Sequence, residues 1–361
     1  MSAQRFYPLS TVQPYPFEQW WVAARSNELG RTLLARTFLE QPVVMYRTAA
    51  GEALALAGLC PHRLFPLAKG RLVGDALECG YHGFRYDGTG RCVHIPTQPE
   101  VKGRMGVRSF PLRERGGLAW IWMGDAERAA ATPLPAIEAT GVGAAGWATE
   151  YHPLATVRAR YTLLIENLMD LSHITYIHAD TIPGGDAVAG LPYEIEEGEA
   201  SLNLRRVARG MPPNPFLRLL FPDNADPIDQ RFDAEYLGPG LIRTGGLIEA
   251  VAAGGARRAL GTTNFVHAIT PETPGSLHYF VQTSRDFRLD DAQLAGMNLA
   301  AGLKIQPQDV EAIEAIELNA SRHGDTRREI SCNADAGGLR VRRRLSAQIA
   351  REAPAGLPSQ P

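Results

Sequence analysis

Several features that mark particular classes of protein are missing from this sequence. No stretch approaches the roughly 20 apolar residues that a membrane-spanning helix needs. The N-terminus has neither a basic segment followed by an apolar run nor a small-residue cleavage site of the kind that signal peptides carry. The formal net charge is only −2, which gives no reason to expect nucleic acid or an anionic membrane as a partner. We therefore expect a cytoplasmic protein that binds neither membrane nor nucleic acid.

Cysteine is also scarce, and a dinucleotide-binding fingerprint is missing. Disulfides are rare in a reducing compartment, so cysteines that cluster are interpreted first as metal ligands. No G-x-G-x-x-G motif follows a predicted strand, so the sequence offers no NADH site of its own. The 361 residues include four cysteines, which are Cys60, Cys79, Cys92 and Cys332.

The residues that are present describe an ordinary globular chain, long enough for two domains. Hydrophobic residues make up 45% and charged residues 21% of it, as in soluble proteins generally. Short β-like runs broken by glycine fill the chain from residue 19 to about 125. Residues 126–146 are poor in large apolar side chains and predict a linker or surface connection. The N-terminal part is therefore predicted to be an all-β domain over residues 1–130.

The remaining sequence predicts a mixed second domain over residues 147–361. β-like segments near 147–162 are followed by a helix, by further strands between about 190 and 285, and by two helices at the end. Residues 211–228 carry enough prolines to be a long loop, which would cover a pocket or fold down on the core. The fold class is therefore α+β: an N-terminal all-β domain and a C-terminal domain with an antiparallel sheet and flanking helices.

Two cysteines and two histidines form the first candidate metal site. Cys60 and His62 stand in a C-x-H motif, and Cys79 and His82 follow in a C-x-x-H motif. A Rieske [2Fe–2S] centre holds one iron with two cysteines and the other with two histidines, so each loop must contribute one of each. Structural zinc is the competing interpretation, although zinc ligands are usually paired two to four residues apart. Neighbouring residues suit tight loops whose backbone N–H groups approach cluster sulfurs, namely Pro61, Gly80 and Gly83.

The two motifs resemble the Rieske domain of the ring-hydroxylating and O-demethylating non-heme iron oxygenases. The early stretch EQWWVAARSNEL is similar to the opening strand of that family. The resemblance implies a Rieske [2Fe–2S] cluster held by Cys60, His62, Cys79 and His82. Such a cluster transfers single electrons, so the second domain needs a chemistry of its own.

His173 and His178 are the candidate histidines of a second metal site. They lie five positions apart in the stretch NLMDLSHITYIH, residues 167–178. On a continuous helix they would point about 140° apart, and on a strand they would face opposite sides, so both reach one metal only if the helix breaks or bulges between them. The plain alternative is an amphipathic surface helix. The stretch resembles the family segment NLxDxxHxxYxH, which implies a mononuclear Fe(II) site with two histidines and one carboxylate.

The carboxylate is predicted to come from the stretch QPQDVEAIEAIELNASRHG. Drawn as a helix, Asp309 falls in an apolar arc with Ala312, Ile313 and Ile316, where an unpaired carboxylate is costly. The family's third ligand is likewise an aspartate that opens a late helix, which implies Asp309. A charge that stabilises a helix N-terminus is the alternative role for Asp309. Glu317, at the border of the same arc, is the substitute ligand.

Two more residues of the histidine stretch receive roles from the resemblance. In the family, an aspartate at this position bridges a Rieske histidine of one subunit and an iron-ligating histidine of the next. This implies a path from His82 through Asp170 to His173 across an interface, and hence a ring of subunits, most simply a homotrimer. Asn167 is expected to line the iron pocket, although an asparagine that packs the helix fits the sequence as well.

The resemblance covers nearly the whole chain and points to the vanillate demethylase and dicamba monooxygenase branch, to which ITPETPGSLHYF and SRDFRLDD are also similar. It implies an oxygenase component that oxidises a small aromatic acid with O₂. Electrons would come from NADH through a separate flavin and iron–sulfur reductase, or a ferredoxin. O-demethylation of a methoxy group with formaldehyde release is the favoured reaction. Methyl or ring hydroxylation, or diaryl ether cleavage, of an aromatic carboxylate or sulfonate is the alternative.

Two rival classes of protein would use only part of these motifs. An electron-transfer Rieske protein needs the first site alone, and a zinc-binding interaction module needs no iron. The substrate is the least determined part of the prediction. Asn264, His267 and the proline-rich loop of residues 211–228 are the candidates for contacting an aromatic acid.

Overall fold

The protein divides into two compact units, each described here by itself. The β-rich unit comprises Tyr15–Leu134, with Thr270–Pro274 and residues from Gln348 on, and the mixed unit comprises Pro135–Ile269 and Gly275–Ala347. The predicted domain boundaries at residues 130 and 147 stay a prediction. The computed structural model describes residues 14–101, 105–182, 185–199, 201–212, 215–323 and 329–352.

The β-rich unit is made of three small antiparallel sheets in its described part, with strand orders β1-β10-β9, β2-β3-β4 and β5-β6-β7-β8. Apolar residues on β1 and β10 are buried throughout, because both faces of this pair are covered. The strands are β1 (Trp20–Arg25), β2 (Leu34–Phe38), β3 (Gln41–Arg47), β4 (Ala53–Ala57), β5 (Arg71–Val73), β6 (Ala76–Glu78), β7 (Arg85–Tyr86), β8 (Cys92–His94), β9 (Leu112–Arg115) and β10 (Leu118–Trp122). Single turns of 3₁₀ helix occur at η1 (Ser26–Glu28) and η2 (Leu67–Lys69).

The segment predicted as a linker is more ordered than its composition suggested. Its alanines form α1 (Ala126–Ala131), because the Asp125 side chain accepts a hydrogen bond from the Glu127 amide and caps the helix. A 3₁₀ turn, η3 (Ile137–Thr140), follows and buries Ile137 completely. The division between the two compact units falls inside this segment, after Leu134, so it does connect them, and what the sequence did not predict is the helix. Alanine is both small and the best helix former, so a composition typical of a linker also suits a short helix.

An antiparallel sheet forms the frame of the mixed unit. Within the described residues it has eight strands in the order β11-β18-β17-β16-β15-β14-β13, with β12 also paired to β18. This confirms the predicted α+β domain with an antiparallel sheet. The strands are β11 (Ala148–Tyr151), β12 (Ala155–Val157), β13 (Tyr193–Glu197), β14 (Leu202–Met211), β15 (Ile228–Gly238), β16 (Leu241–Val251), β17 (Arg257–Thr273) and β18 (Ser276–Arg285).

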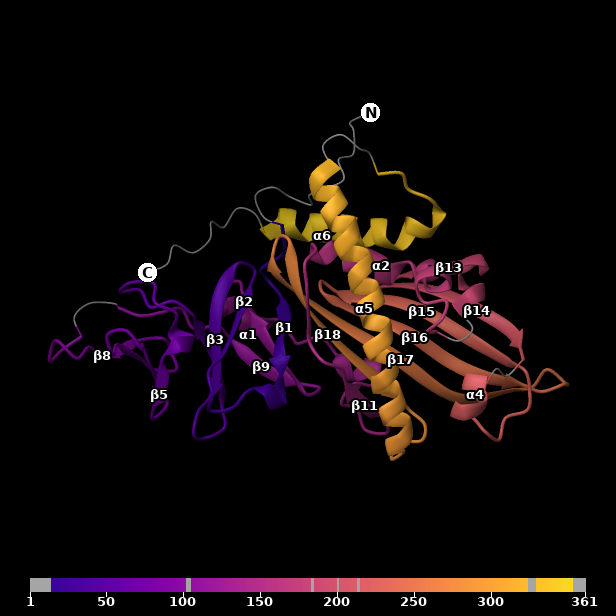
Figure 1. The fold of residues 1–361 in the computed structure, drawn as a ribbon, viewed down its shortest axis with the longest axis horizontal. Helices are drawn as coiled ribbons and strands as arrows, with labels where there is room; N and C mark the ends of the chain where they lie inside the picture. Colours follow the sequence, from indigo (N-terminus) through magenta and orange to yellow (C-terminus); the bar gives the residue numbers. More distant parts are fainter. Residues whose placement is uncertain are drawn as a thin grey trace. The chain divides into compact units, whose positions relative to one another are not determined.

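Helices on this sheet carry the residues of the second candidate site. The long helix α5 runs across the sheet, with α2 beside it (Figure 1). Within the described residues, no helix combines the length and the apolar character needed to cross a membrane. The remaining elements are α2 (Tyr161–Met169), η4 (Leu171–His173), α3 (Ile174–Ile177), η5 (Gly185–Gly190), α4 (Pro215–Leu220), α5 (Ala292–His323), η6 (Asn333–Asp335) and α6 (Ala336–Glu352).

The proline-rich segment, predicted to be one long loop, contains a helix. Its residues 215–220 form α4, which was missed because prolines dominate the segment, although proline is tolerated in the first turn of a helix. Leu217 of α4 packs with Ile228 and Ile248 of the sheet in a small apolar cluster. The segment therefore folds down on the core, which is one of the two outcomes its composition allowed.

A glycine fixes how closely α5 approaches the rest of its unit. A Cβ at Gly302 would lie 2.2 Å from Nδ1 of His152. The His152 ring is buried, and its Nε2 lies 2.6 Å from the Thr283 hydroxyl, so the ring has little freedom to move aside. Side-chain atoms closer than van der Waals contact force shifts of packed groups.

Gly302→Ala is therefore expected to lower the free energy of unfolding by about 1–3 kcal/mol. Gly296, in the same helix, has no atom within 4 Å of its built Cβ. Gly296→Ala should instead stabilise the protein by up to about 1 kcal/mol through helix propensity. Urea unfolding of the two variants measures the difference. Equal stabilisation by both alanines would contradict the close packing at Gly302.

Candidate metal centres

The two loops of the first candidate site share one backbone design. In each loop the cysteine amide donates to the carbonyl five residues later, and the cysteine carbonyl accepts from the amide four residues later. The residue at that fourth position has a left-handed backbone in both loops, with φ of 54° at Leu64 and 70° at Gly83. Equivalent turns therefore hold Cys60 and Cys79, although the two motifs, C-x-H and C-x-x-H, differ in spacing.

The cysteine side chains of these loops are buried and the histidine side chains are exposed, which suits a cluster with one cysteine-bound and one histidine-bound iron. Cys60 and Cys79 are buried, whereas His62 and His82 are exposed, with ring centroids 4.7 Å apart. The hydroxyl of Tyr86 lies 3.1 Å from Sγ of Cys60. Burial raises the pKa of the Cys60 thiol, so its thiolate needs a compensating positive group. Two inner sulfurs and two outer imidazoles fit the ligand set of a Rieske cluster.

The histidines of the second site lie where helical structure is interrupted. Helix α2 ends at Met169, and Asp170 has an extended backbone with φ −122° and ψ 93°. A 3₁₀ turn ending at His173 leads directly into the short α3, and His178 lies just after α3 with φ −106° and ψ 18°. A break or bulge of one helix between the two histidines was predicted. Instead, the chain is interrupted at Asp170, before both histidines, and α3 ends at Ile177, so that His178 lies outside the helix.

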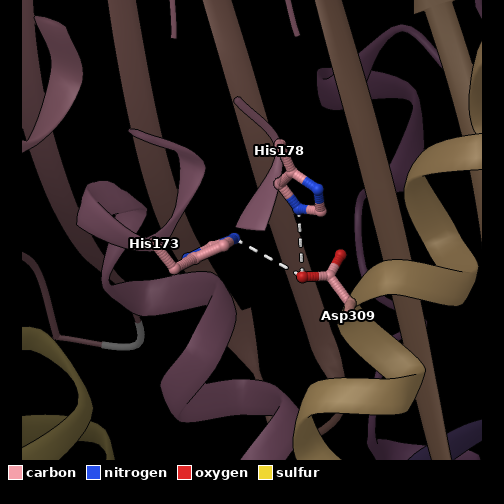
Figure 2. Close-up of side chains that lie close together, drawn as sticks. All are labelled: His173, His178 and Asp309. Carbon is pink, nitrogen blue, oxygen red and sulfur yellow. Dashed lines mark hydrogen bonds and ion pairs between the residues drawn. The ribbon is translucent and has the colours of Figure 1, made fainter. Parts of the chain in front are cut away.

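Three side chains converge on one point of the mixed unit (Figure 2). The Nε2 atom of His178 lies 3.1 Å from Oδ1 of Asp309, and the Nε2 atom of His173 lies 3.5 Å from the same oxygen. One potential ligand atom from each residue lies within 4.8 Å of the other two. Asp309 is 4% exposed. The structure thus brings together the three residues that the sequence predicted as one site.

The setting of Asp309 differs from the prediction in two respects. It lies in the middle of the 32-residue helix α5 rather than at a helix start, because Pro307 is accommodated inside the helix. The predicted apolar arc is also narrower, since Ile313 is buried but Ile316 is 45% exposed. A helix N-terminal role is excluded by this position. The substitute candidate Glu317 is instead bound by Arg160 at 2.5 Å.

The pKa values of Asp309 and His178 are shifted in opposite directions by their contact. Burial alone would raise the pKa of the Asp309 carboxyl, but the hydrogen bond with His178 and the charges of both histidines lower it below its usual value. Burial alone would lower the pKa of His178, but the Asp309 carboxylate outweighs it and raises that pKa. A buried carboxylate is stable only if paired or bound to a cation.

The donor set fits a metal ion. When both histidines carry their proton on Nδ1, their Nε2 lone pairs and the Asp309 oxygen all face one point. Acceptor atoms this close repel one another unless a cation or additional protons lie between them. Two imidazoles and one carboxylate are the ligands of the facial site that holds non-heme Fe(II).

Asn167 and Asp170 border this point in different ways. The Asn167 side chain donates to Oδ1 of Asp309 at 2.9 Å. The backbone carbonyl of Asp170, rather than its carboxylate, lies 2.6 Å from Nδ1 of His173. The carboxylate accepts from the Ser172 amide at 2.9 Å and lies 3.9 Å from Arg206. Within one chain, therefore, it is the main chain of Asp170 that contacts the His173 ring, and its carboxylate points elsewhere.

Asn264 and His267, the two residues predicted to contact substrate, lie on opposite faces of the sheet. They lie three positions apart on β17, and an odd separation on a strand places side chains on opposite faces. His267 is buried with Nδ1 2.7 Å from the Tyr279 hydroxyl, and burial lowers its pKa to about 4. Asn264 accepts from Arg243 and donates to the Thr140 carbonyl. With these partners Asn264 has a structural role, and it lies on the face opposite His267.

Gln308 and Thr181 also contact the site, and both were missed from the sequence. The Gln308 amide oxygen lies 2.9 Å from Nδ1 of His178 and 2.8 Å from the Thr181 hydroxyl. Gln308 precedes Asp309 in the helix, and Thr181 follows His178 by three residues. Their closeness in sequence to Asp309 and His178 could have indicated a role at the site. Polar residues near a helix or turn are so common, however, that this closeness alone does not indicate function.

Comparison with protein families assigns both parts of the chain. The Rieske [2Fe–2S] domain family matches residues 19–111, and the vanillate O-demethylase oxygenase C-terminal domain family matches residues 157–351. A Rieske domain joined to this second domain defines the class of Rieske oxygenases. The chain belongs to the vanillate O-demethylase oxygenase family within that class. The predicted family and the predicted Rieske domain are thereby confirmed.

Individual relatives match over most of their length. The oxygenase component of dicamba O-demethylase from Stenotrophomonas maltophilia is 33% identical over 90% of this chain and 95% of its own. The vanillate O-demethylase oxygenase subunit of Pseudomonas sp. strain HR199 is 31% identical over 94% of this chain and 96% of its own. The iron–sulfur subunit TsaM1 of a toluene-4-sulfonate monooxygenase system from Comamonas testosteroni is 32% identical over 88% and 92%.

Solved structures agree with this assignment. Dicamba monooxygenase bound to 3,6-dichlorosalicylic acid superposes with a TM-score of 0.84 at 30% identity, covering 93% of this chain and 98% of the other. Dicamba monooxygenase with non-heme iron and dicamba gives 0.78 at 29% identity, covering 92% and 97%. The chain is therefore an oxygenase component of a Rieske monooxygenase, and an electron-transfer protein or a zinc module is set aside.

Proposed function

We propose that this oxygenase component removes a methyl group from a small methoxylated aromatic acid and releases formaldehyde. The convergence of His173, His178 and Asp309 in a chain that also carries the paired cysteine and histidine loops is the observation that carries the proposal. Relatives named as vanillate and dicamba O-demethylases support this choice of reaction. When iron is bound, it would supply O₂ activation with electrons that arrive through the Rieske cluster.

The proposal assigns a task to each group of residues. Nε2 of His173, Nε2 of His178 and Oδ1 of Asp309 would hold the mononuclear iron, in a domain over residues 147–361. Cys60, Cys79, His62 and His82 would hold the cluster, in a domain over residues 1–130. Asn167 keeps the Asp309 carboxylate oriented through its 2.9 Å hydrogen bond. His267 is neutral at pH 7 because burial lowers its pKa to about 4, and the hydroxyls of Tyr279 and Thr244 contact its two ring nitrogens.

The test is a formaldehyde assay with purified protein, NADH and a matching flavin and iron–sulfur reductase. A panel of methoxylated aromatic acids should give formaldehyde and the corresponding phenol in equal amounts. NADH oxidation without formaldehyde on every methoxylated member, together with hydroxylated product from methylated members, would overturn demethylation. That second reaction, hydroxylation of a methyl-bearing aromatic sulfonate or carboxylate, is favoured by the likeness to the toluene-4-sulfonate monooxygenase subunit.

We further propose that the working unit is a homotrimer in which Asp170 bridges His82 of one subunit and His173 of the next. The exposure of each partner supports this. His82 lies at the surface of its loop, and the Asp170 carboxylate is 23% exposed. Two exposed aromatic residues lie near them in the sequence. Tyr81 precedes His82, Tyr176 follows Asp170 by six positions, and their side chains are 58% and 76% exposed. Exposed aromatic residues of this kind are enriched at protein interfaces.

Tyr176→Asp is expected to break this assembly. A buried charge in place of an aromatic anchor costs several kcal/mol of association free energy, about a hundredfold or more in affinity. Light scattering should give the wild-type protein a mass about three times the 39.3 kDa chain, and the variant a mass near one chain. The control is Leu219→Asp, which changes an exposed leucine on α4. A wild-type protein that is monomeric at micromolar concentration would contradict the bridge.

A further inference from the structure

His178 can bind a metal through Nε2 only if its proton lies on the other ring nitrogen. A neutral imidazole carries one N–H, and the nitrogen without it is the ligand. Nδ1 of His178 lies 2.9 Å from Oε1 of Gln308, an oxygen that can only accept. In this arrangement Nδ1 carries a proton, and when the ring is neutral Nε2 presents its lone pair toward Asp309.

The opposite orientation of the Gln308 amide would close the site. Its NH₂ group would then donate to Nδ1, which forces the proton onto Nε2. From there the proton would point at Oδ1 of Asp309, 3.1 Å away, in the place where a metal would bind. An amide can rotate between these orientations, so another group must decide which one is populated.

Thr181 is that group. Its hydroxyl lies 2.8 Å from Oε1 of Gln308, and its alternative acceptor, the His178 carbonyl, lies farther away at 3.3 Å. A hydroxyl has one proton to donate, and donation to Oε1 favours the orientation in which Oε1 faces both partners. His173 needs no such device, because its Nδ1 lies 2.6 Å from the backbone carbonyl of Asp170, which cannot rotate in this way.

We propose that Gln308, held by Thr181, is a positioning residue that keeps the His178 proton on Nδ1 and thereby sets the affinity of the mononuclear site for its metal. The inference rests on the proposed iron ligands. One ligand histidine is thus fixed by the main chain and the other by a side-chain pair. Loss of such an outer partner typically weakens metal binding by 10–100-fold.

The experiment measures Co(II) binding to the full-length protein, with its Rieske cluster intact, by competition with a chelator and by the visible absorption of bound Co(II). Gln308→Leu should weaken Co(II) binding by about 10–100-fold. Gln308→Glu, which can only accept at both oxygens, should bind at least as tightly as wild type. Thr181→Val should weaken binding several-fold, and Thr181→Ser, which keeps the hydroxyl, should not.

Each outcome bears on the proposal. Wild-type affinity in Gln308→Leu, or affinity as weak in Gln308→Glu as in Gln308→Leu, would overturn it. If Gln308→Leu does not fold, as judged by loss of the Rieske spectrum, the Thr181→Val and Thr181→Ser pair decides. Failure of the ligand assignment is recognised separately, because Asp309→Ala would then bind Co(II) as well as wild type.

Discussion

His178→Ala is expected to abolish substrate oxidation while the Rieske spectrum stays unchanged. The side chain is buried, its Nε2 faces Asp309 at 3.1 Å, and alanine leaves one histidine and one carboxylate for the metal. Removal of a ligand should cost more than the roughly 100-fold that loss of an outer-shell partner costs. The cluster loops lie in the other compact unit and are untouched by the change.

Iron content and product formation together measure this effect. The variant should lose the mononuclear iron and all product, whereas the cluster absorption remains. His323→Ala, which changes an exposed histidine at the end of α5, is the matched control and should behave as wild type. Turnover at the wild-type rate in His178→Ala would remove His178 from the ligand set.

Asp170→Asn should keep both metal sites filled but slow turnover by more than about 100-fold. The asparagine oxygen can still accept from the Ser172 amide, so the turn that carries His173 is preserved. The backbone carbonyl that meets Nδ1 of His173 is also unchanged. What is lost is the carboxylate charge that would bind the partner subunit's Rieske histidine in the proposed trimer.

Rapid mixing of prereduced protein with O₂ and substrate follows the electron transfer directly. In Asp170→Asn, oxidation of the cluster should be slow even though the reductase reduces it at the normal rate. Asp180→Asn, at an exposed carboxylate ten residues further along the chain, should leave both rates unchanged. Cluster oxidation at wild-type speed in Asp170→Asn would show that the electron takes another path.

The sequence was most informative where chemistry dictates residue types. A Rieske cluster needs cysteine and histidine from each of two loops, and this requirement identified both loops from residue types and spacing alone. Likewise, a carboxylate amid apolar residues is costly without a partner, and this argument selected Asp309 as the candidate ligand. Chemical constraints of this kind are local in sequence, so one chain is enough to detect them.

The features that the sequence did not predict depend on how the chain folds and packs. The segment before Asp309 continues a helix because α5 lies along the sheet, and this overrides the preference of Pro307 to end it. The orienting contact to His173 comes from the Asp170 carbonyl, and no side-chain pattern reveals a main-chain acceptor. The contacts of Gln308 with His178 and of Thr181 with Gln308 exist only in the folded chain, because Gln308 lies 130 residues after His178.

Metal and sulfide analysis of the purified protein tests most directly whether one chain carries both centres. The account predicts about three iron atoms and two acid-labile sulfides per chain, as one [2Fe–2S] cluster and one mononuclear iron require. Asp309→Ala should retain about two irons with both sulfides. A colourless protein that contains zinc and no acid-labile sulfide would contradict the account.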